Sequence, residues 1–312
     1  MKIYNCIKDF KPIKNAVVTI GTFDGVHLGH VTVFNQMKTE AAIINGETVV
    51  VTFYPHPRIV LSLDSVNLKF IKTQEKKIQY IEKAGIDHLI IIEFTKKFAK
   101  TESDVFIKDL IIKKIHPKIL IIGYDHQFGN NRKGSFEMLN NLSKEFGFVV
   151  KQVEARRIKE ITISSTKIRN LLIQGNITEA NSLLGHEYSI TGKVVKGQSI
   201  GHNLGFPTAN IEVRDEYKLI AAVGVYACRV HCMDKTYMGM ANIGFRPTVE
   251  KRSKQYVGIT IEVNIFDFDK AIYGKEITIS FVKRMRDEHK FKNIEALKKQ
   301  LIIDKINTLK IL

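Results

Sequence analysis

Two histidines three residues apart, His27 and His30, follow a glycine-rich stretch that ends an apolar run. The apolar run suits a buried strand, and the residues after the histidines carry apolar side chains at helical spacing. Both imidazoles therefore lie on one face of a helix, at its start. Unpaired N–H groups and the helix dipole attract phosphate there. The stretch predicts a nucleotide site, with a simple tight turn at Gly21 and Gly25 as the alternative.

Three further stretches bring polar side chains to strand ends or helix starts. Residues 52–58 directly follow an apolar strand, so His56 and Arg58 can enter the same crevice. Residues 123–134 follow another strand and are rich in side chains able to read a ring edge. Residues 163–169 open a helix whose hydroxyls and terminal arginine can clamp a polyphosphate. An ordinary helix N-cap is the alternative for that last stretch.

The elements that must position these residues alternate between strands and helices as far as about residue 184. The strand-like runs are short, apolar and β-branched, as in strands buried on both faces. This pattern predicts a doubly wound, parallel α/β sheet that binds its ligand outside the carboxyl ends of the strands. The expected strands are residues 17–20, 49–53, 89–94, 119–122 and 148–153, and the expected helices are 31–45, 73–84, 103–115 and 135–146.

The pattern changes near Gly185. Strand-like runs broken by Gly, Pro, Asn and Asp replace the alternation, and a long helical pattern returns only at residues 293–303. Such a sequence predicts a small antiparallel β-barrel with a C-terminal helix. Two domains are therefore expected, residues 1–185 and 186–312. The barrel strands are expected at residues 188–195, 224–231, 236–243, 256–268 and 276–281.

The composition is that of a globular chain with a basic surplus. The 312 residues contain 48 Lys+Arg against 32 Asp+Glu, a net charge of +16, which suits nucleic acid and small anionic substrates equally. Lysine pairs such as Lys76 and Lys77 are interpreted as solvated helix surface. The three cysteines show no metal spacing and predict free thiols in a reducing compartment. With no signal-peptide core and no membrane-length run, we expect a cytoplasmic protein without a membrane partner. We also expect no nucleic-acid partner and no obligate protein partner.

The block Gly-Thr-Phe-Asp-Gly-Val-His-Leu-Gly-His at residues 21–30 resembles the HxGH signature of the nucleotidyltransferase superfamily. With Phe-Tyr-Pro-His-Pro and Ile-Ser-Ser-Thr-Lys-Ile-Arg, it is similar to the FMN adenylyltransferase half of bacterial bifunctional riboflavin kinase/FAD synthetases. The resemblance implies that His27 and His30 contact the ATP phosphates. The other residues that it assigns to ATP are Gly21, Phe23, Asp24, Ser165, Thr166 and Arg169, and those that it assigns to flavin or nucleotide are His56, Arg58, Asp125 and Asn131. Thr22 and His126 stand where many members have Asn and Phe.

The second half contains no Walker A motif. Its polar, glycine-rich loop at residues 197–210, taken alone, favours a turn between strands. Together with residues 241–248, 261–263 and 284–291, the loop resembles the riboflavin kinase domain, for which Phe-Pro-Thr-Ala-Asn is the most specific motif. The resemblance implies Mg²⁺ ligands at Thr208 and Asn210, ATP contacts at Gly197, Gly201, Gly205, Pro207, Thr208 and Asn210, a general base at Glu262, and flavin contacts at Arg286 and Glu288. His202 replaces an Arg found in many members.

Glu262 also carries an expectation from the residues alone. It lies in an alternating run in which period two puts it on one face of a strand with Asn264. A solvent-facing carboxylate is the alternative to a base that accepts the proton of the riboflavin 5′-hydroxyl.

The combined expectation is a bifunctional enzyme with riboflavin, FMN and ATP as its partners and Mg²⁺ as its cofactor. The C-terminal domain would phosphorylate riboflavin to FMN, and the N-terminal domain would adenylate FMN to FAD with release of pyrophosphate. A member with one activity lost is disfavoured because both motif sets are present. An RNA-binding protein on this fold would show salt-sensitive RNA binding. Another HxGH enzyme, such as a pantetheine-phosphate adenylyltransferase, would leave the second half unexplained.

Overall fold

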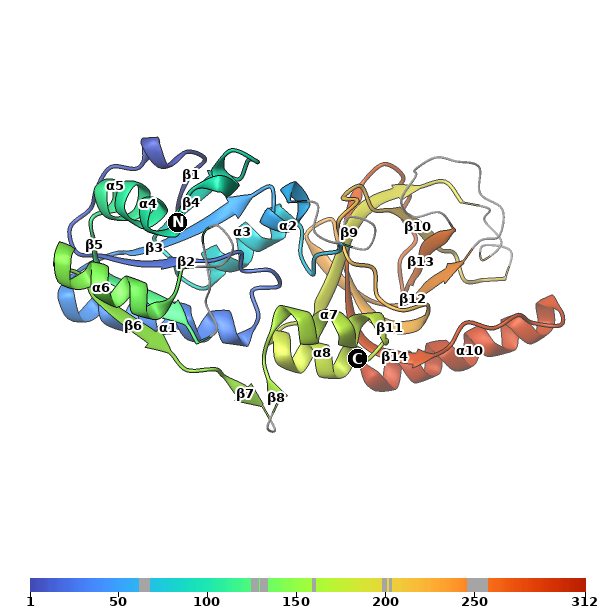
Figure 1. Ribbon diagram of the computed structural model, residues 1–312. Coiled ribbons are helices and arrows are strands. Elements are labelled where there is room, and N and C mark those ends of the chain that lie inside the picture. The colour runs from blue at the N-terminus through green and yellow to red at the C-terminus, as the bar shows by residue number, and fades with distance from the viewer. Residues whose placement is uncertain are drawn as a thin grey trace. The chain divides into compact units, whose positions relative to one another are not determined.

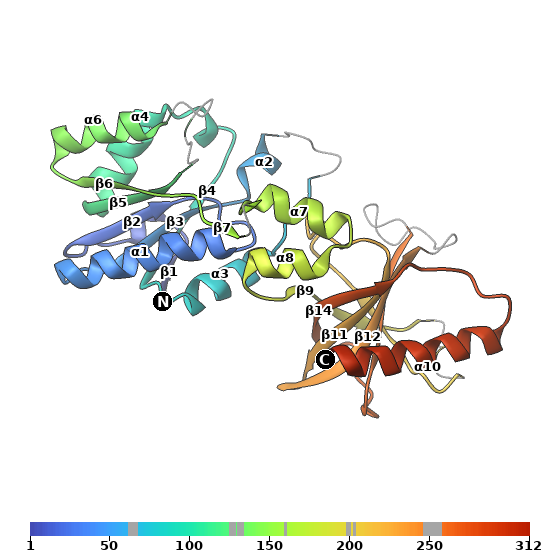
Figure 2. The same ribbon diagram turned by 90° about the horizontal axis from the view of Figure 1, so that it is seen from below.

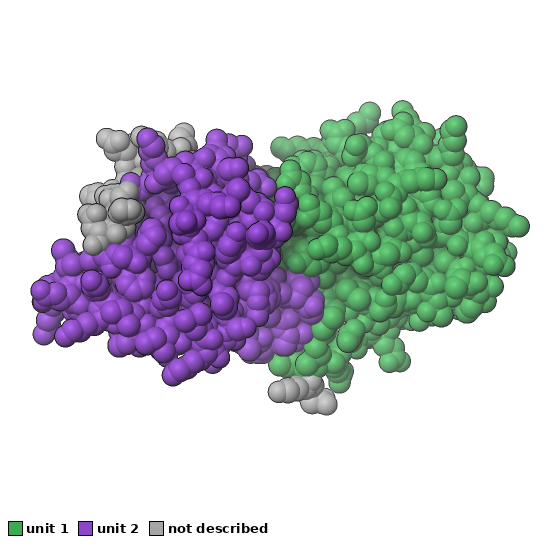
Figure 3. Space-filling view, turned by 180° about the vertical axis from the view of Figure 1, so that it is seen from behind, with its two compact units in different colours: residues 1–165 green, residues 166–312 purple. Residues whose placement is uncertain are grey.

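The computed structural model describes residues 1–61, 68–124, 129, 134–158, 161–197, 201, 204–245 and 258–312. The chain divides into two compact units, Met1–Ser165 and Thr166–Leu312 (Figure 3). The domain boundary expected between residues 185 and 186 stays a prediction.

A six-stranded sheet forms the centre of the first unit, and all its strands run parallel (Figure 1). The spatial order β1-β4-β3-β2-β5-β6 is that of a doubly wound sheet. After the edge strand β1, the chain enters the middle of the sheet at β2, adds β3 and β4 on one side and then β5 and β6 on the other. The strands are β1 (Lys2–Tyr4), β2 (Ala16–Ile20), β3 (Thr48–Tyr54), β4 (His88–Glu93), β5 (Pro117–Gly123) and β6 (Val149–Val153).

Helices cover both faces of this sheet, as the view from below shows (Figure 2). One apolar core lies under α1 (Leu28–Ile44) and α3 (Gln74–Lys83) and contains Phe34, Met37 and Ile81. The helices that contribute to the other core are the π-helix η3 (Phe106–Ile112), α5 (Lys113–Ile115) and α6 (Phe136–Phe146). The short helix α4 (Ser103–Val105) directly precedes η3. The smaller elements are η1 (Ile7–Asp9), α2 (Pro57–Val60), η2 (Phe98–Lys100) and the hairpin of β7 (Arg157–Ile158) and β8 (Ile161–Thr162).

The second unit contains a closed, antiparallel six-stranded barrel in the order β10-β13-β12-β11-β14-β9. Two short helices, α7 and α8, precede the barrel in the chain. The Asn181 side chain of α8 attaches this helix to the barrel: its Nδ2 donates to the Phe281 carbonyl and its Oδ1 accepts the Tyr188 N–H, both at 2.8 Å. The long C-terminal helix packs along β11, β12 and β14 (Figure 2). The elements are α7 (Ser165–Ile173), α8 (Ile177–Leu184), β9 (Tyr188–Val195), β10 (Ala209–Glu212), β11 (Gly224–Cys232), β12 (Lys235–Phe245), β13 (Ile259–Ile265), β14 (Glu276–Arg286) and α10 (Ile294–Ile311).

The structure confirms the predicted fold class in both halves. The observed elements differ from the predicted ones where the sequence pattern is short or where an element ends. Strands β1 and β10 were not expected, because each is too short to show a period. Strand β14 and helix α10 continue five and eight residues beyond their predicted ends, at 281 and 303. The three thiols are free, with Cys6 exposed and the other two buried.

Candidate functional sites

The turn between β2 and α1 has a strained backbone. Phe23, Gly25 and Val26 have φ angles of 51°, 86° and 44°. A left-handed φ is costly for a β-branched residue such as Val26, which is also buried. The turn closes with a hydrogen bond of 3.2 Å from the Val26 N–H to the Phe23 carbonyl. Strain that the surrounding packing holds in place is typical of ligand-binding turns.

His27 and His30 lie at the start of α1, as the sequence predicts. His27 is the N-cap residue, and its Nδ1 accepts the His30 N–H at 3.4 Å. The two rings stack with centroids 3.6 Å apart and planes 17° apart, and the ring of Phe23 meets His30 edge-on. The Nδ1 atom of His30 is buried without a hydrogen-bond partner among the residues described. Burial is the largest of the causes that lower the pKa of His30 well below 6.5, so its ring is neutral at pH 7.

A buried lysine donates a hydrogen bond to the turn between β2 and α1. Lys77 in α3 is 6% exposed, and its Nζ donates to the Thr22 carbonyl at 3.3 Å and to Thr52 Oγ1 at 3.2 Å. Burial lowers the pKa of Lys77 to about 8, while the Asp24 carboxylate opposes this shift. The solvated role assigned to Lys77 from the sequence is therefore wrong. Its position four residues before the buried Ile81 places both on one helix face, which was the available signal.

Two residues expected to contact ATP also have structural partners. The Asp24 carboxylate accepts the backbone N–H of Ile71, at 3.0 Å, and of Lys72, at 3.3 Å. Phe23 is buried against Phe34 of the core. These contacts hold the turn in shape, and the ATP contacts of both residues stay predictions.

The start of α7 is attached to the same turn. Ser165 Oγ donates to the Asp24 carbonyl at 2.8 Å, so one of the three predicted clamp residues lies beside the histidine stretch. Thr166, which is exposed, and Arg169, which is half-buried, continue α7 in the second unit. Their placement opposite the histidines stays a prediction. Gly21 needs its small size, because a Cβ there would lie 2.9 Å from the Phe23 ring.

The loop after β3 brings His56 and Arg58 together. His56 is the N-cap of α2, its Nδ1 accepts the Arg58 N–H at 3.2 Å, and its ring lies 4.3 Å from that of Phe70. The other two residues predicted to contact flavin or nucleotide, Asp125 and Asn131, lie outside the described residues, as does His126.

In the barrel, Glu262 lies in a row of polar side chains across three strands. Its partner in register on β10 is Asn210, and its partner on β12 is Asn242. Residues directly opposite in neighbouring antiparallel strands point to the same side of the sheet. Thr208 Oγ1 reaches Glu262 Oε2 at 3.5 Å, the upper limit for a hydrogen bond. The half-buried carboxylate of Glu262 is thus surrounded by oxygen and amide groups.

The Phe-Pro-Thr-Ala-Asn segment is fixed at both ends. Asn264, two residues from Glu262 as the period predicts, is buried and donates from Nδ2 to the Pro207 carbonyl at 2.7 Å. Gly197 lies so close to Asn210 that a Cβ would be 2.0 Å from its amide nitrogen. The hydroxyl and amide oxygens of Thr208 and Asn210 are hard donors of the kind that Mg²⁺ accepts, and they fit the ion expected there.

Two other glycines shape the loop before this segment. The Gly201 carbonyl accepts the N–H groups of Leu204 and Phe206, at 3.1 and 2.9 Å. Gly205 has a φ of 81°, which a residue with a side chain adopts only with strain. His202 lies outside the described residues.

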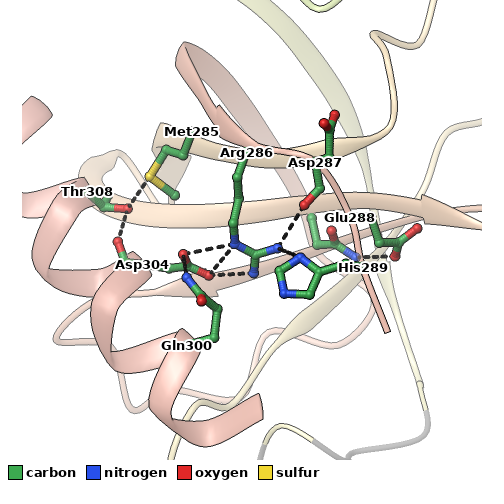
Figure 4. Close-up of polar contacts among 9 residues, drawn as sticks. Met285, Arg286, Asp287, Glu288, His289, Gln300, Asp304 and Thr308 are labelled. Carbon is green, nitrogen blue, oxygen red and sulfur yellow. Dashed lines mark hydrogen bonds and ion pairs between the residues drawn. The ribbon is translucent and has the colours of Figure 1, made fainter. Parts of the chain in front are cut away.

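Arg286 and Glu288 have well-defined protein partners (Figure 4). The Arg286 guanidinium pairs with Asp304 of α10 and donates to the Asp287 carbonyl. The Glu288 carboxylate accepts the side-chain amide of Asn242 at 3.2 Å and the Phe245 N–H at 3.3 Å. Glu288 thus contacts β12, the strand that pairs with β13 next to Glu262. The flavin contacts of Arg286 and Glu288 stay predictions. The sequence did not single out Asn242 and Asp304 as neighbours of the predicted residues, because only the strand register and the docked helix bring them there.

The fold and these two candidate sites are typical of a class of transferase that binds nucleotide phosphates at a helix start of a parallel sheet, and a second candidate site lies in the barrel. Family models match both halves: one described as FAD synthetase matches residues 10–167, and one described as riboflavin kinase matches residues 184–312. Among curated proteins, a "Bifunctional riboflavin kinase/FMN adenylyltransferase" of Haemophilus influenzae is 37% identical over 93% of this chain and 92% of its own length. The one of Listeria monocytogenes is 36% identical, over 94% and 91%. The chain belongs to the family of bifunctional riboflavin kinase/FMN adenylyltransferases, which confirms the resemblance seen in the sequence.

A solved structure from Streptococcus pneumoniae, described as a macrolide-efflux protein, is also similar. It matches with a TM-score of 0.87 and 31% identity over 98% of this chain and 97% of its own. That description does not fit the two family models, and we assign no transport role to this chain. No helix within the described residues has both the length and the apolar character needed to cross a bilayer.

Proposed function

We propose that the chain makes FAD from riboflavin in two ATP-dependent steps, one in each half. Riboflavin kinase and FMN adenylyltransferase activities are those of the family to which the chain belongs. The observation that carries the assignment of both activities is that each half has its own set of reactive side chains. The functional boundary is proposed at residues 185 and 186.

In the adenylyltransferase step, the FMN phosphate attacks the α-phosphorus of ATP and pyrophosphate leaves. No covalent intermediate with the protein is needed, so the residues act by positioning and by neutralising charge. We assign this role to His27 and His30 at the helix start, with Ser165, Thr166 and Arg169 on the other side of the phosphates. A neutral His30 suits the role, because it can donate a hydrogen bond to an incoming phosphate and gain a proton as negative charge approaches.

The remaining assignments in this half are secondary contacts. Gly21, Phe23 and Asp24 would shape the ATP site, whereas His56, Arg58, Asp125 and Asn131 would contact flavin or nucleotide. The support for the first three is the strained turn that they build, with its hydrogen bonds to Ile71 and Lys72.

In the kinase step, Glu262 would accept the proton of the riboflavin 5′-hydroxyl as that oxygen attacks the γ-phosphorus of ATP and ADP leaves. Thr208 and Asn210 would hold Mg²⁺, which supplies charge neutralisation at the phosphates. Gly197, Gly201, Gly205 and Pro207 would form the loop over the nucleotide, and Arg286 and Glu288 would lie at the flavin. The proximity of Thr208 and Asn210 to Glu262 supports this arrangement.

The test is to incubate the purified protein with riboflavin and MgATP and to separate the flavins by chromatography over time. We expect FMN to appear first and FAD to follow, and FMN supplied alone with MgATP to yield FAD. Omission of Mg²⁺, with EDTA present, should stop riboflavin phosphorylation. A protein that makes FMN but never FAD, or that uses only added FMN, would contradict the assignment of two activities.

A further inference from the structure

Asp304 in α10 is a buried carboxylate that neither proposed reaction uses. It is 2% exposed, although it lies near the C-terminus on a helix with much exposed surface. Its two oxygens accept three contacts from Arg286: Nε to Oδ1 at 3.0 Å, Nε to Oδ2 at 3.2 Å and Nη2 to Oδ2 at 2.6 Å. Gln300, one turn earlier on α10, donates to Oδ1 at 2.9 Å (Figure 4). This is a fork-to-carboxylate pair with a second residue that orients the carboxylate.

The other side of the Arg286 guanidinium holds the chain that follows β14. Its Nη1 donates to the Asp287 carbonyl at 2.9 Å and lies 3.3 Å from Nδ1 of His289. The Phe291 ring lies 5.9 Å from the guanidinium carbon. Arg286 therefore joins the helix to the segment 287–291, with Asp304 fixing the plane of the guanidinium.

This segment places Glu288 at the row of polar side chains around the proposed base. Glu288 accepts from Asn242 and from the Phe245 N–H, and Asn242 lies opposite Glu262 in the β12–β13 register. The fit is close, because a Cβ on Gly244 would lie 2.2 Å from Glu288 Oε1. A continuous series of contacts thus runs from Asp304 through Arg286 and the backbone to Glu288 and Asn242.

A buried ion pair is a poor way to attach a helix, because desolvation offsets much of its attraction and apolar packing serves as well. It does fix a planar group in one orientation. We propose that Asp304 is a positioning residue of the kinase site, which acts through Arg286 to hold residues 287–289, and Glu288 in particular, in the arrangement that binds riboflavin. This inference rests on the proposed function, which puts Arg286 and Glu288 at the flavin.

The test is steady-state kinetics of the full chain carrying Asp304→Asn, with both activities measured. We expect the KM for riboflavin to rise about tenfold, the equivalent of about 1.4 kcal/mol. The KM for ATP in the kinase reaction and the adenylylation of added FMN should stay within about twofold. Gln300→Met removes only the hydrogen bond that orients the Asp304 carboxylate. It should therefore raise the KM for riboflavin less than Asp304→Asn does. Asp269→Asn, the same change at an exposed aspartate after β13, is the matched control.

A double-mutant cycle with Arg286→Met shows whether Asp304 acts through Arg286. In the Arg286→Met protein, adding Asp304→Asn should change the KM for riboflavin little, whereas additive effects would overturn the proposal. An unchanged KM for riboflavin in Asp304→Asn and Gln300→Met, or equal rises for riboflavin and ATP with a lower Tm, would also overturn it. The phosphorylation of riboflavin by the unmodified protein tests the proposed function separately, so the two failures are distinguishable.

Discussion

At the scale of single residues, His30 has the properties expected of a side chain that binds phosphate. Its Nδ1 is buried without a partner among the described residues, and the ring is stacked between His27 and the turn. Such a group is costly to bury unless a ligand completes it. The geometry therefore favours a ligand-binding role of His30 over a purely structural one.

His30→Ala should lower the rate of FAD formation from FMN by about 100-fold or more, because a positioned donor to the reacting phosphates is lost. Riboflavin should still be converted to FMN, which accumulates. Chromatography of the flavins after incubation with riboflavin and MgATP measures both. Simultaneous loss of the two activities would mean that His30 supports the whole chain rather than one reaction.

The buried Lys77 gives a prediction on pH. The pKa is about 8 in the folded protein and about 10.5 in the unfolded chain, so between these values the unfolded chain holds more protons. The free energy of unfolding of the unmodified protein should therefore rise with pH across this window, by up to about 3 kcal/mol from this group. Below pH 8 both states carry the charge, and the cost of burying it is present in full.

Lys77→Met should remove that rise, whereas Lys76→Met, one residue away and less buried, should keep it. Urea unfolding between pH 7 and 10.5 measures the difference. The same variant loses the two donors to Thr22 and Thr52, so adenylylation of FMN should fall about tenfold while the kinase rate stays. Parallel pH profiles of the Lys77→Met and unmodified proteins would show that the lysine is solvated after all.

At the scale of elements, the loop between β9 and β10 begins with Gly197, which packs closely against the Asn210 side chain. Gly197→Ala would put a Cβ 2.0 Å from the Asn210 amide, so this side chain must turn away. Asn210 is the proposed Mg²⁺ ligand, and we expect the KM for MgATP in the kinase reaction to rise about tenfold or more. Adenylylation of FMN should not change. Kinetics at varied MgATP check this, and an unaltered KM would remove Asn210 from the nucleotide site.

The sequence predicts elements well where a period runs long enough. Strand β9 was predicted to the residue and α6 to within one, because each carries a clear pattern and clear ends. Strand β10 was not predicted, because Ala209–Glu212 is too short to show a period. Its first two residues were interpreted only as part of the Phe-Pro-Thr-Ala-Asn motif. The π-helix within residues 103–115 was predicted as ordinary helix, because its apolar spacing is nearly the same.

Contacts between distant elements were beyond prediction for a different reason. The sequence singles out His27 and His30 by their spacing, and Glu262 through the family resemblance, as candidate site residues. Asn242 meets Glu262 only through the register of β12 on β13, and Asp304 reaches Arg286 only once α10 has docked. No local pattern encodes such register or docking.

At the scale of the whole molecule, the residues proposed for the two reactions lie on units that have separate apolar cores. The sheet unit packs its own apolar cores on both faces, and the barrel closes on itself. Each proposed set of reactive residues is thus built largely on one scaffold, with α7 as the element that belongs to both in sequence. The net charge of +16 suits a protein whose substrates carry phosphates, with no need for nucleic acid.

The last prediction uses this division. Glu262→Gln should lower riboflavin phosphorylation by about 100-fold or more while added FMN is still adenylated, because only the base of the kinase step is lost. This variant is then the converse of His30→Ala, and neither alone should make FAD from riboflavin at an appreciable rate. Mixed together, they should do so after a lag, because FMN made by the barrel of one chain leaves it and reaches the sheet unit of another. Time courses of the mixture, with each variant alone as control, measure the lag and the final rate. If FMN accumulated in the mixture without FAD, transfer of FMN within a single chain would be required, and the view of two separable sites would be wrong.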